Sequence, residues 1–274
     1  MKLALKALLR PLFKLLMLLL VALLSLQLYF VGRIALMAIS APESTTFQRS
    51  EIYRVVTTTG ALKWSQSWLP YTQISVNLKR AVIASEDASF TEHDGLDLEA
   101  LEKAWGKNVV AEQRAQKQAD RLAADAAKRQ SNKQNSSANG APAPLKFVAQ
   151  APKIVGGSTI TQQLAKNLFL SGERTLLRKS EELVLTLLLE AMLNKQRILE
   201  IYLNNVEWGE GIFGAEAAAQ HYFRKPAARL TPYEAARLAV MLPRPRYFET
   251  RPNSDYLASR ANTIVARMGG VDVP

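Results

Sequence analysis

The feature that most constrains this chain is an uncharged run near its N-terminus, Leu15–Gly32, composed largely of Leu, Val and Ala. It has about the length that a helix needs to cross a bilayer. Basic residues precede it and acidic residues do not, so we predict a cytoplasmic basic tail over 1–14 and a transmembrane anchor over 15–39. The alternative is a cleaved signal peptide with a small-residue site at Ala38–Ser40. The length of the run, and Arg33 between the run and that site, favour the anchor.

The net charge of +11 is unevenly distributed along the chain. Residues 1–33 contribute +5 and residues 107–133 contribute +4, which leaves +2 for the remainder. Because this distribution provides no broad basic face, we expect no nucleic-acid partner. An anionic membrane surface is the better partner for these basic residues. The sequence has no Cys, which excludes disulfides, thiolate catalysis and Cys-based metal sites.

Helical spacing of apolar residues dominates the chain from Ile74 onward. Ser75 or Asn77 is suited to cap the first helix, and Thr231–Glu234 has the capping residue, the first-turn Pro and the Glu that are typical of a helix start. Few stretches alternate with period two, so we predict a mainly α fold in which strands are minor. Ala41–Tyr71 is predicted to be an extended connection. The other predicted helices cover 97–110, 158–170, 175–194, 195–204, 213–223, 231–242 and 253–268.

Residues 106–153 differ in composition from the rest of the predicted domain, which covers 44–274. They are rich in Ala, Gln, Lys, Asn and Ser. Helix propensity favours a helix over 111–130, yet Leu122 is almost the only large apolar side chain there, so such a helix has no stripe with which to dock. We therefore predict a mobile insertion, with 131–145 disordered.

Two adjacent carboxylates, Glu86 and Asp87, follow the apolar segment Ala81–Ala84. A carboxylate at the end of an apolar segment has the surroundings that raise its pKa and suit it to act as a general base. The alternative is an acidic pair at a helix end that forms ion pairs with surface Lys. His93, a few residues later, is interpreted as a local structural hydrogen-bonding group.

The run Gly156–Asn167, GGSTITQQLAKN, combines a Gly pair, hydroxyls, amides and a Lys at a predicted helix start. Ser158 or Thr159 can cap the helix, and a helix N-terminus beside a Lys suits a phosphate or a carboxylate. An ordinary junction between a loop and a helix, with solvated Gln residues, is the alternative.

The predicted helix Thr175–Asn194 is apolar nearly all round, which indicates a buried helix. Its polar residues Arg178, Glu182, Thr186 and Glu190 recur every four residues and form one stripe. Charges in a buried helix need partners or a ligand, so we predict a polyanion site there. An internal Arg178–Glu182 pair is the alternative and is compatible with that site.

The segment Lys195–Asn205 is interpreted mainly as scaffold, with Ile198, Ile201 and Tyr202 in the core. Gly209, Gly211 and Gly214 then indicate a tight loop between helices.

In their order and spacing these motifs resemble a family 51 glycosyltransferase. This is the peptidoglycan polymerase module of class A penicillin-binding proteins and of monofunctional biosynthetic transglycosylases, which has a lysozyme-like helical fold. No SxxK or KTG motif occurs, which favours the monofunctional type. Two departures are the 106–153 insertion and Val155, where many relatives have a basic residue; Lys153 is the candidate substitute. The resemblance extends from about Thr45 to Met268 and rests on Glu86-Asp87-x-x-Phe90-x-x-His93-x-Gly95, the 156–167 run, Arg178-Lys179-x-x-Glu182, Arg197-Ile198-Leu199-Glu200-x-Tyr202-Leu203-Asn204 and Glu207–Phe223.

The resemblance implies polymerisation of lipid II into β-1,4-linked glycan strands, with inversion and release of a lipid pyrophosphate. Glu86 and Glu182 are the implied catalytic residues: Glu86 as the base on the acceptor 4-hydroxyl, Glu182 as the group that orients the basic cluster and touches the substrate. No cofactor is strictly required, and a divalent cation, Mg or Mn, is an option at Asp87. The implied substrate-binding residues are Asp87, Ser158, Thr159, Gln162, Gln163, Lys166, Asn167, Arg174, Arg178 and Lys179.

The implied location is the bacterial inner membrane, with the catalytic domain in the periplasm. The implied partners are lipid II, the nascent strand, membrane lipids and other cell-wall synthesis or division proteins. Two alternatives are a lysozyme-like lytic enzyme and a non-catalytic membrane-tethered scaffold. A lytic enzyme must protonate a sugar leaving group and usually does so with two carboxyls, so it has no use for the cations around Glu182.

Overall fold

The computed structural model describes residues 2–42, 44–134, 157–170 and 175–274. The chain divides into two units. The first consists of Met1–Leu96 and Thr159–Pro274, and the second of Asp97–Ser158.

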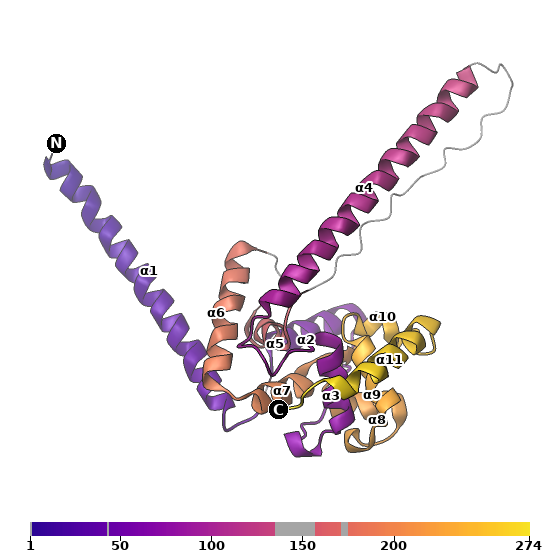
Figure 1. Cartoon of the computed structure of the whole chain (residues 1–274). Coiled ribbons are helices and arrows are strands. Elements are labelled where there is room, and N and C mark those ends of the chain that lie inside the picture. The colour runs from indigo at the N-terminus through magenta and orange to yellow at the C-terminus, as the bar shows by residue number, and fades with distance from the viewer. Residues whose placement is uncertain (1, 43, 135–156, 171–174) are drawn as a thin grey trace. The chain divides into compact units, whose positions relative to one another are not determined.

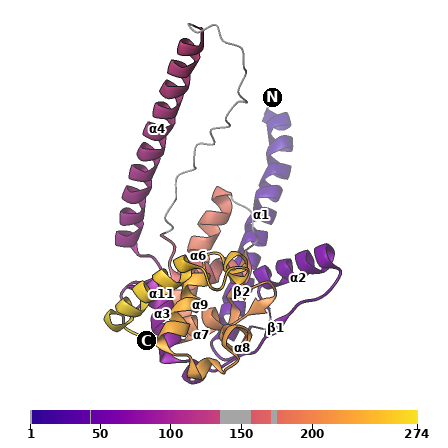
Figure 2. The same cartoon turned by 90° about the vertical axis from the view of Figure 1, so that its right-hand side faces the viewer.

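Helices form the core of the first unit. Three of them, α3 (Val76–Glu86), α9 (Pro232–Met241) and α11 (Asp255–Arg267), lie side by side (Figures 1 and 2). Beside them α5 (Ile160–Phe169) packs against α6 (Leu176–Met192) and α7 (Lys195–Asn205). The prediction of a mainly α fold is confirmed. The largest fully buried side chains are Trp208, Tyr202, Phe90 and Phe213.

Side-chain caps set where these helices begin. Thr231 caps α9 in a capping box with Glu234, and Pro232 occupies the first turn, as predicted. Thr159 caps α5 in the same way: its hydroxyl accepts from Gln162 N–H, and the Gln162 side chain accepts from Thr159 N–H at 3.1 Å. Because a helix start leaves backbone N–H groups without partners, each box satisfies two of them and fixes the first turn.

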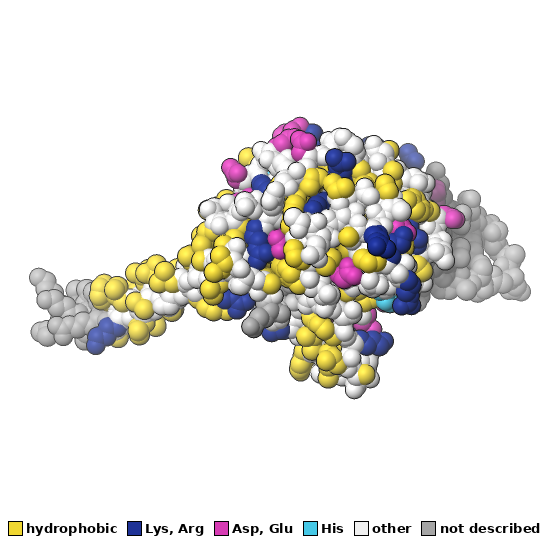
Figure 3. All heavy atoms as spheres, turned by 90° about the horizontal axis from the view of Figure 1, so that it is seen from below, with side chains coloured by type: hydrophobic (Ala, Val, Ile, Leu, Met, Phe, Trp, Pro, Cys, Tyr) yellow, Lys and Arg dark blue, Asp and Glu magenta, His cyan; other side chains and the backbone are white. Residues whose placement is uncertain are grey.

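The apolar N-terminal run lies within α1 (Lys2–Met37). A stretch of α1, Pro11–Met37, is long and apolar enough to cross a bilayer, as a single-pass membrane anchor must be, and an 18-residue window within it has a mean hydropathy of 2.4. Most of its side chains are exposed, and Figure 3 shows hydrophobic atoms along this projecting helix. The helix also includes most of the predicted cytoplasmic tail, 1–14. The predicted border between tail and anchor, at residue 15, therefore lies inside α1 and is not a helix end.

The last turns of α1 pack into the core of the first unit. Phe30, Ile34 and Met37 are buried there. Arg197, on α7, donates from Nε to the Met37 carbonyl and from Nη2 to the Ser40 carbonyl, both at 2.7 Å. Cations suit the carbonyl end of a helix, so Arg197 fastens the end of α1 to the helical core.

The prediction of an extended connection over 41–71 is wrong for much of that range. Residues Thr46–Thr59 form α2, which begins at a capping box between Thr45 and Gln48 and ends at Gly60. The Gln48 side chain is buried and donates to Asn205 of α7. Caps and this tertiary contact therefore outweigh the weak helix propensity of the Thr- and Val-rich segment.

A small sheet and several short elements complete the first unit. Its strands β1 (Ser65–Gln66), β2 (Glu207–Gly209) and β3 (Ile212–Phe213) have the order β1-β3-β2, with β1 parallel and β2 antiparallel to β3. The predicted tight Gly loop is the β2–β3 hairpin. The remaining elements are η1 (Tyr71–Gln73), α8 (Ala215–Phe223), η2 (Ala227–Arg229), α10 (Pro245–Glu249) and η3 (Met268–Gly270).

One long helix, α4 (Leu98–Gln134), forms the described part of the second unit together with Gly157 and Ser158. Asp97 caps it, since its carboxylate accepts from Ala100 N–H at 2.7 Å. The helix is longer than the predicted 97–110 and includes the first residues of the 131–145 range that we predicted to be disordered. The rest of that range lies outside the described residues, and the mobility of the insertion stays a prediction.

Candidate active site

Glu86 is the last residue of α3, and the apolar residues before it are buried among the core helices. Glu86 as a residue is half-buried. Burial of its carboxyl raises the pKa of Glu86, and neighbouring Asp87 adds to the rise, while hydrogen bonds from Gln163 and Ser85 oppose it. A carboxylate with a raised pKa has the property that suits a general base.

A chain of hydrogen bonds reaches Glu86 from two other helices. Gln163 of α5 donates from Nε2 to Glu86 Oε2 at 3.1 Å. Tyr202 of α7 donates from Oη to Gln163 Oε1 at 3.0 Å. The sequence predicted Gln163 as a site residue but interpreted Tyr202 as core packing. Tyr202 is indeed buried, yet its hydroxyl points into the site.

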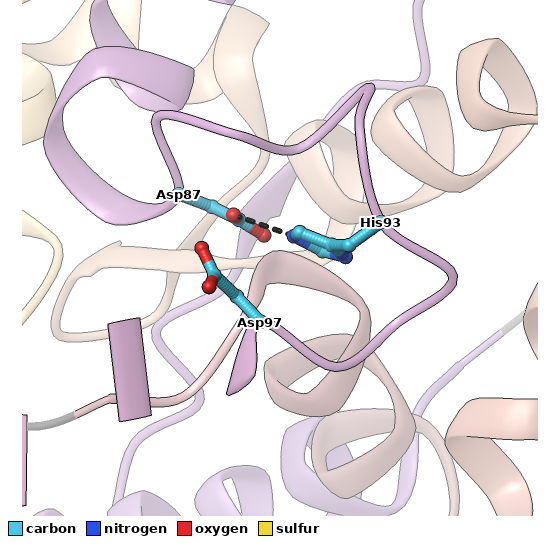
Figure 4. A group of neighbouring side chains, drawn as sticks. All are labelled: Asp87, His93 and Asp97. Carbon is cyan, nitrogen blue, oxygen red and sulfur yellow. Dashed lines mark hydrogen bonds and ion pairs between the residues drawn. The ribbon is translucent and has the colours of Figure 1, made fainter. Parts of the chain in front are cut away.

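Asp87, the residue after Glu86, joins the 87–95 loop to the start of α5. Its Oδ2 accepts from Ile160 N–H at 2.9 Å, in the first turn of α5. Its Oδ1 lies 2.9 Å from Nε2 of His93, and Figure 4 shows the carboxylate and the ring facing each other. Since Gly95 N–H donates to His93 Nδ1, Nε2 carries the ring proton and donates to Asp87.

Gly95 brings the 87–95 loop close to α5 and α6. Its carbonyl accepts from the Thr159 hydroxyl at 2.7 Å. Its φ is +85°, and a Cβ there would lie 2.7 Å from Cγ2 of Thr186 and 2.9 Å from Cγ of Glu190. The polar stripe predicted on α6 therefore packs, at Thr186 and Glu190, directly against this loop.

Glu190 is the centre of a second polar group, which the sequence reasoning did not anticipate. Its Oε1 accepts from the Thr161 hydroxyl at 2.6 Å and from Lys195 Nζ at 2.8 Å. Lys195 also donates to the His93 carbonyl at 2.5 Å and lies over the Phe90 ring. These contacts hold α5, α6 and the 87–95 loop together. The sequence analysis interpreted the segment that contains Lys195 as scaffold. The positive charge of Lys195 was the one sequence feature that could have indicated its role.

The first turns of α6 contain a basic cluster around a buried carboxylate. Glu182 is 4% exposed and pairs with Lys179 and, from 3.4 Å, with Nη1 of Arg178. The predicted internal pair is thus formed. Nε of Arg178 is buried and has no hydrogen-bond partner in the part of the chain that the structure describes. A buried donor without a partner is costly, so this N–H has an unmet need for an acceptor.

The remaining predicted site residues lie on α5, just before it, and just before α6. Gln163, Lys166 and Asn167 share one face of α5 by their spacing, and Lys166 is exposed on it. Ser158 is exposed and belongs to the second unit. Arg174 lies outside the described residues. Among the described residues, no hydrogen bond or ion pair joins the Glu86 group to the Glu182 cluster.

Comparison with known proteins places these residues in a family. The family described as Transglycosylase matches residues 54–137 and 141–269. A "Biosynthetic peptidoglycan transglycosylase" of Burkholderia thailandensis is 45% identical over 251 residues, which cover 92% of this chain and 83% of the relative. A protein of the same name from Herminiimonas arsenicoxydans is 42% identical over 98% of this chain and 100% of its own length.

The chain belongs to the transglycosylase family. Its helical first unit has the lysozyme-like fold expected of a transglycosylase domain. The family match begins within α2 and ends within η3, just after α11, and so covers the residue groups around Glu86, Glu190 and Glu182. In this transglycosylase, Thr159 and Gln162 cap α5 and Asp87 holds its first turn, whereas Gln163 contacts Glu86.

Proposed function

We propose that this chain polymerises peptidoglycan glycan strands from lipid II. The growing lipid-linked glycan is transferred onto the 4-hydroxyl of a lipid II molecule, with inversion and a new β-1,4 link, and undecaprenyl pyrophosphate leaves. The observation that carries the proposal is the half-buried Glu86, hydrogen-bonded by Gln163 at the end of an apolar helix, in a chain of the transglycosylase family.

Glu86 acts as the base in this proposal. Its carboxylate takes the proton of the acceptor 4-hydroxyl while that oxygen attacks the anomeric carbon of the donor. Burial favours the proton-bound form, which makes the carboxylate a better proton acceptor than a solvated Glu would be. The hydrogen bond from Gln163 to Oε2 and the longer one from Ser85 to Oε1 orient the carboxylate and leave lone pairs for the incoming hydroxyl.

The departing pyrophosphate needs positive charge rather than a proton, because it is already a weak base. Arg178 and Lys179, with Arg174 before them in the sequence, supply that charge, and Glu182 orients them. The unpartnered Nε–H of Arg178 supports this role, since Arg binds phosphate oxygens through fixed N–H groups. Lys166 and Asn167 of α5, with Ser158 and Thr159 at its start, complete the proposed substrate contacts.

The family resemblance makes Asp87 the candidate ligand of a divalent cation. Both Asp87 oxygens accept hydrogen bonds, and the facing nitrogen of His93 carries a proton. Protonated imidazole nitrogen is no metal ligand, so these residues do not fit a Mg²⁺ or Mn²⁺ ion in this arrangement. No step of the proposed reaction passes through a metal.

The proposed location follows from α1. With the N-terminal basic residues in the cytoplasm, the part of the first unit that follows α1 lies on the periplasmic side of the bacterial inner membrane, where lipid-linked substrate and membrane lipids are its partners. Other cell-wall synthesis or division proteins are proposed partners, and nucleic acid is not.

The test compares two matched Glu→Gln variants on lipid II. Glu86→Gln should remain folded and lose polymerisation, whereas Glu92→Gln, the same change at an exposed position of the adjacent loop, should polymerise like the wild type. Robust polymerisation by Glu86→Gln would remove Glu86 as the base. Loss of activity in both variants would show that the loop is sensitive to any substitution and would leave the role of Glu86 unsupported.

A further inference from the structure

Tyr202 is buried in the core and carries one polar atom, its hydroxyl. It is 1% exposed, and its hydroxyl donates to Gln163 Oε1 at 3.0 Å. From its other end, the same amide donates to Glu86 Oε2 at 3.1 Å. Three helices, α7, α5 and α3, thus contribute one residue each to a single line of hydrogen bonds that ends at the proposed base.

The amide of Gln163 has two orientations, related by a half-turn. In the observed one, the Tyr202 O–H and the Gln163 N–H each meet an acceptor. After a half-turn, the amide oxygen would face the Glu86 carboxylate, acceptor against acceptor. The Tyr202 proton would then have no acceptor among the described residues, and an unsatisfied buried donor is costly. The phenol therefore selects the orientation in which Gln163 donates to Glu86.

The Tyr202 hydroxyl remains protonated and can therefore always donate its hydrogen bond to Gln163. Complete burial, together with the charges of Glu86 and Asp87, raises the pKa of Tyr202 well above its ordinary value of 10. A hydroxyl that cannot ionise in the working range of the protein keeps the amide oriented throughout that range.

We propose that Tyr202 is a positioning residue for the transfer reaction: it holds the Gln163 amide so that this amide in turn orients the Glu86 carboxylate. The inference rests on the proposed function of Glu86 and extends it to a residue that does not touch the substrate. It predicts a specific kinetic pattern, since an orienting group affects the chemical step and leaves substrate binding unchanged.

The test is steady-state polymerisation of lipid II by Tyr202→Phe, which removes the hydroxyl and keeps the ring. We expect kcat to fall about tenfold, the kinetic effect of one ordinary hydrogen bond, with KM unchanged. The matched control is Tyr222→Phe. Tyr222 donates to the Trp208 carbonyl at 2.7 Å, in the scaffold, and this variant should keep the wild-type kcat.

A double-variant cycle separates positioning from general stability. If Tyr202 acts through Gln163, then in a Gln163→Ala background Tyr202→Phe should cause no further loss of kcat. Three results would each overturn the proposal. They are a wild-type kcat in Tyr202→Phe, a change in KM with kcat unaffected, and a double variant in which the kcat losses of the two single variants multiply. Should Tyr202→Phe not fold, an unchanged kcat in Gln163→Ala would still overturn the proposal, because among the described residues Gln163 is the link between Tyr202 and Glu86.

The outcomes also separate this inference from the proposed function. If the wild type makes no polymer, the proposed function fails. If the wild type polymerises and Tyr202→Phe matches it, only the positioning role fails.

Discussion

Gly95→Ala tests how the 87–95 loop is held against α6. The residue has a φ of +85°, which L side chains rarely adopt, and its missing Cβ would meet Thr186 Cγ2 at 2.7 Å and Glu190 Cγ at 2.9 Å. The matched control is Gly60→Ala. Gly60 has a φ of +70°, and a Cβ there would have nothing within 4 Å, so the control carries the backbone cost without the steric one.

The expected losses of stability follow from these contacts. A left-handed backbone costs an L residue about 1–2 kcal/mol, and an extra carbon in a filled site costs about 1–3 kcal/mol. Gly60→Ala should therefore lose only the backbone contribution to the free energy of unfolding. Gly95→Ala should lose the backbone and the steric contributions together. The difference between the two variants, about 1–3 kcal/mol, corresponds to a Tm lower by about 2–12 °C for a domain of this size.

The assay is thermal unfolding of the detergent-solubilised protein, followed by near-ultraviolet circular dichroism. Thr186→Ser supplies a rescue: it removes the clashing methyl and keeps the hydroxyl that donates to the Glu182 carbonyl at 2.7 Å. Added to Gly95→Ala, it should restore part of the lost Tm. Equal Tm values for the two Gly variants, or no rescue by Thr186→Ser, would refute the packing argument.

Three further predictions concern the charges and the insertion. Arg178→Ala should weaken lipid II binding by about 1–3 kcal/mol, the worth of a charge-assisted hydrogen bond, whereas Arg260→Ala, at an exposed position of α11, should not; unchanged affinity of Arg178→Ala would contradict the pyrophosphate role. Burial raises the pKa of Glu86 in the folded protein above its ordinary value of 4.5, which applies to the unfolded chain. The folded wild type therefore binds this proton more tightly, and its free energy of unfolding falls as the pH rises from 4.5 toward the pKa of the folded state. Glu86→Gln, which cannot ionise, should thus gain in Tm relative to the wild type between pH 4 and pH 7; a constant difference would argue against a desolvated carboxylate. Deletion of 111–145 should preserve cooperative unfolding, and its loss in a thermal melt would show that the insertion is structural.

The helices that were predicted well carry local signals. Ser75 and Thr231 cap their helices as the sequence indicated, because a cap is a contact between residues three or fewer apart. The α2 helix was missed although it also begins at a local capping box, Thr45 with Gln48, because the helix propensity of its Thr- and Val-rich sequence is weak. Its tertiary contact with Asn205, 157 residues from Gln48, cannot be read from local propensity.

The sequence predicted the site residues that have a local signal and missed those that depend on contacts between distant residues. An apolar run followed by Glu86 is readable from sequence, and so is the spacing of Arg178 and Glu182. The role of Tyr202 is not, since its helical spacing matches that of its buried apolar neighbours and only folding brings its hydroxyl to Gln163. Asp87 illustrates the converse: the family resemblance assigned its carboxylate to the substrate or a cation, and the fold uses both oxygens to hold α5 and His93.

The central claim is that this chain joins sugars at a membrane rather than cleaving them. The most direct measurement is incubation of the purified full-length protein with lipid II, followed by separation and mass analysis of the products. The account predicts glycan polymer with released undecaprenyl pyrophosphate and no shortened products when preformed glycan is supplied. Hydrolysis products from preformed glycan, with lipid II unconsumed, would contradict it.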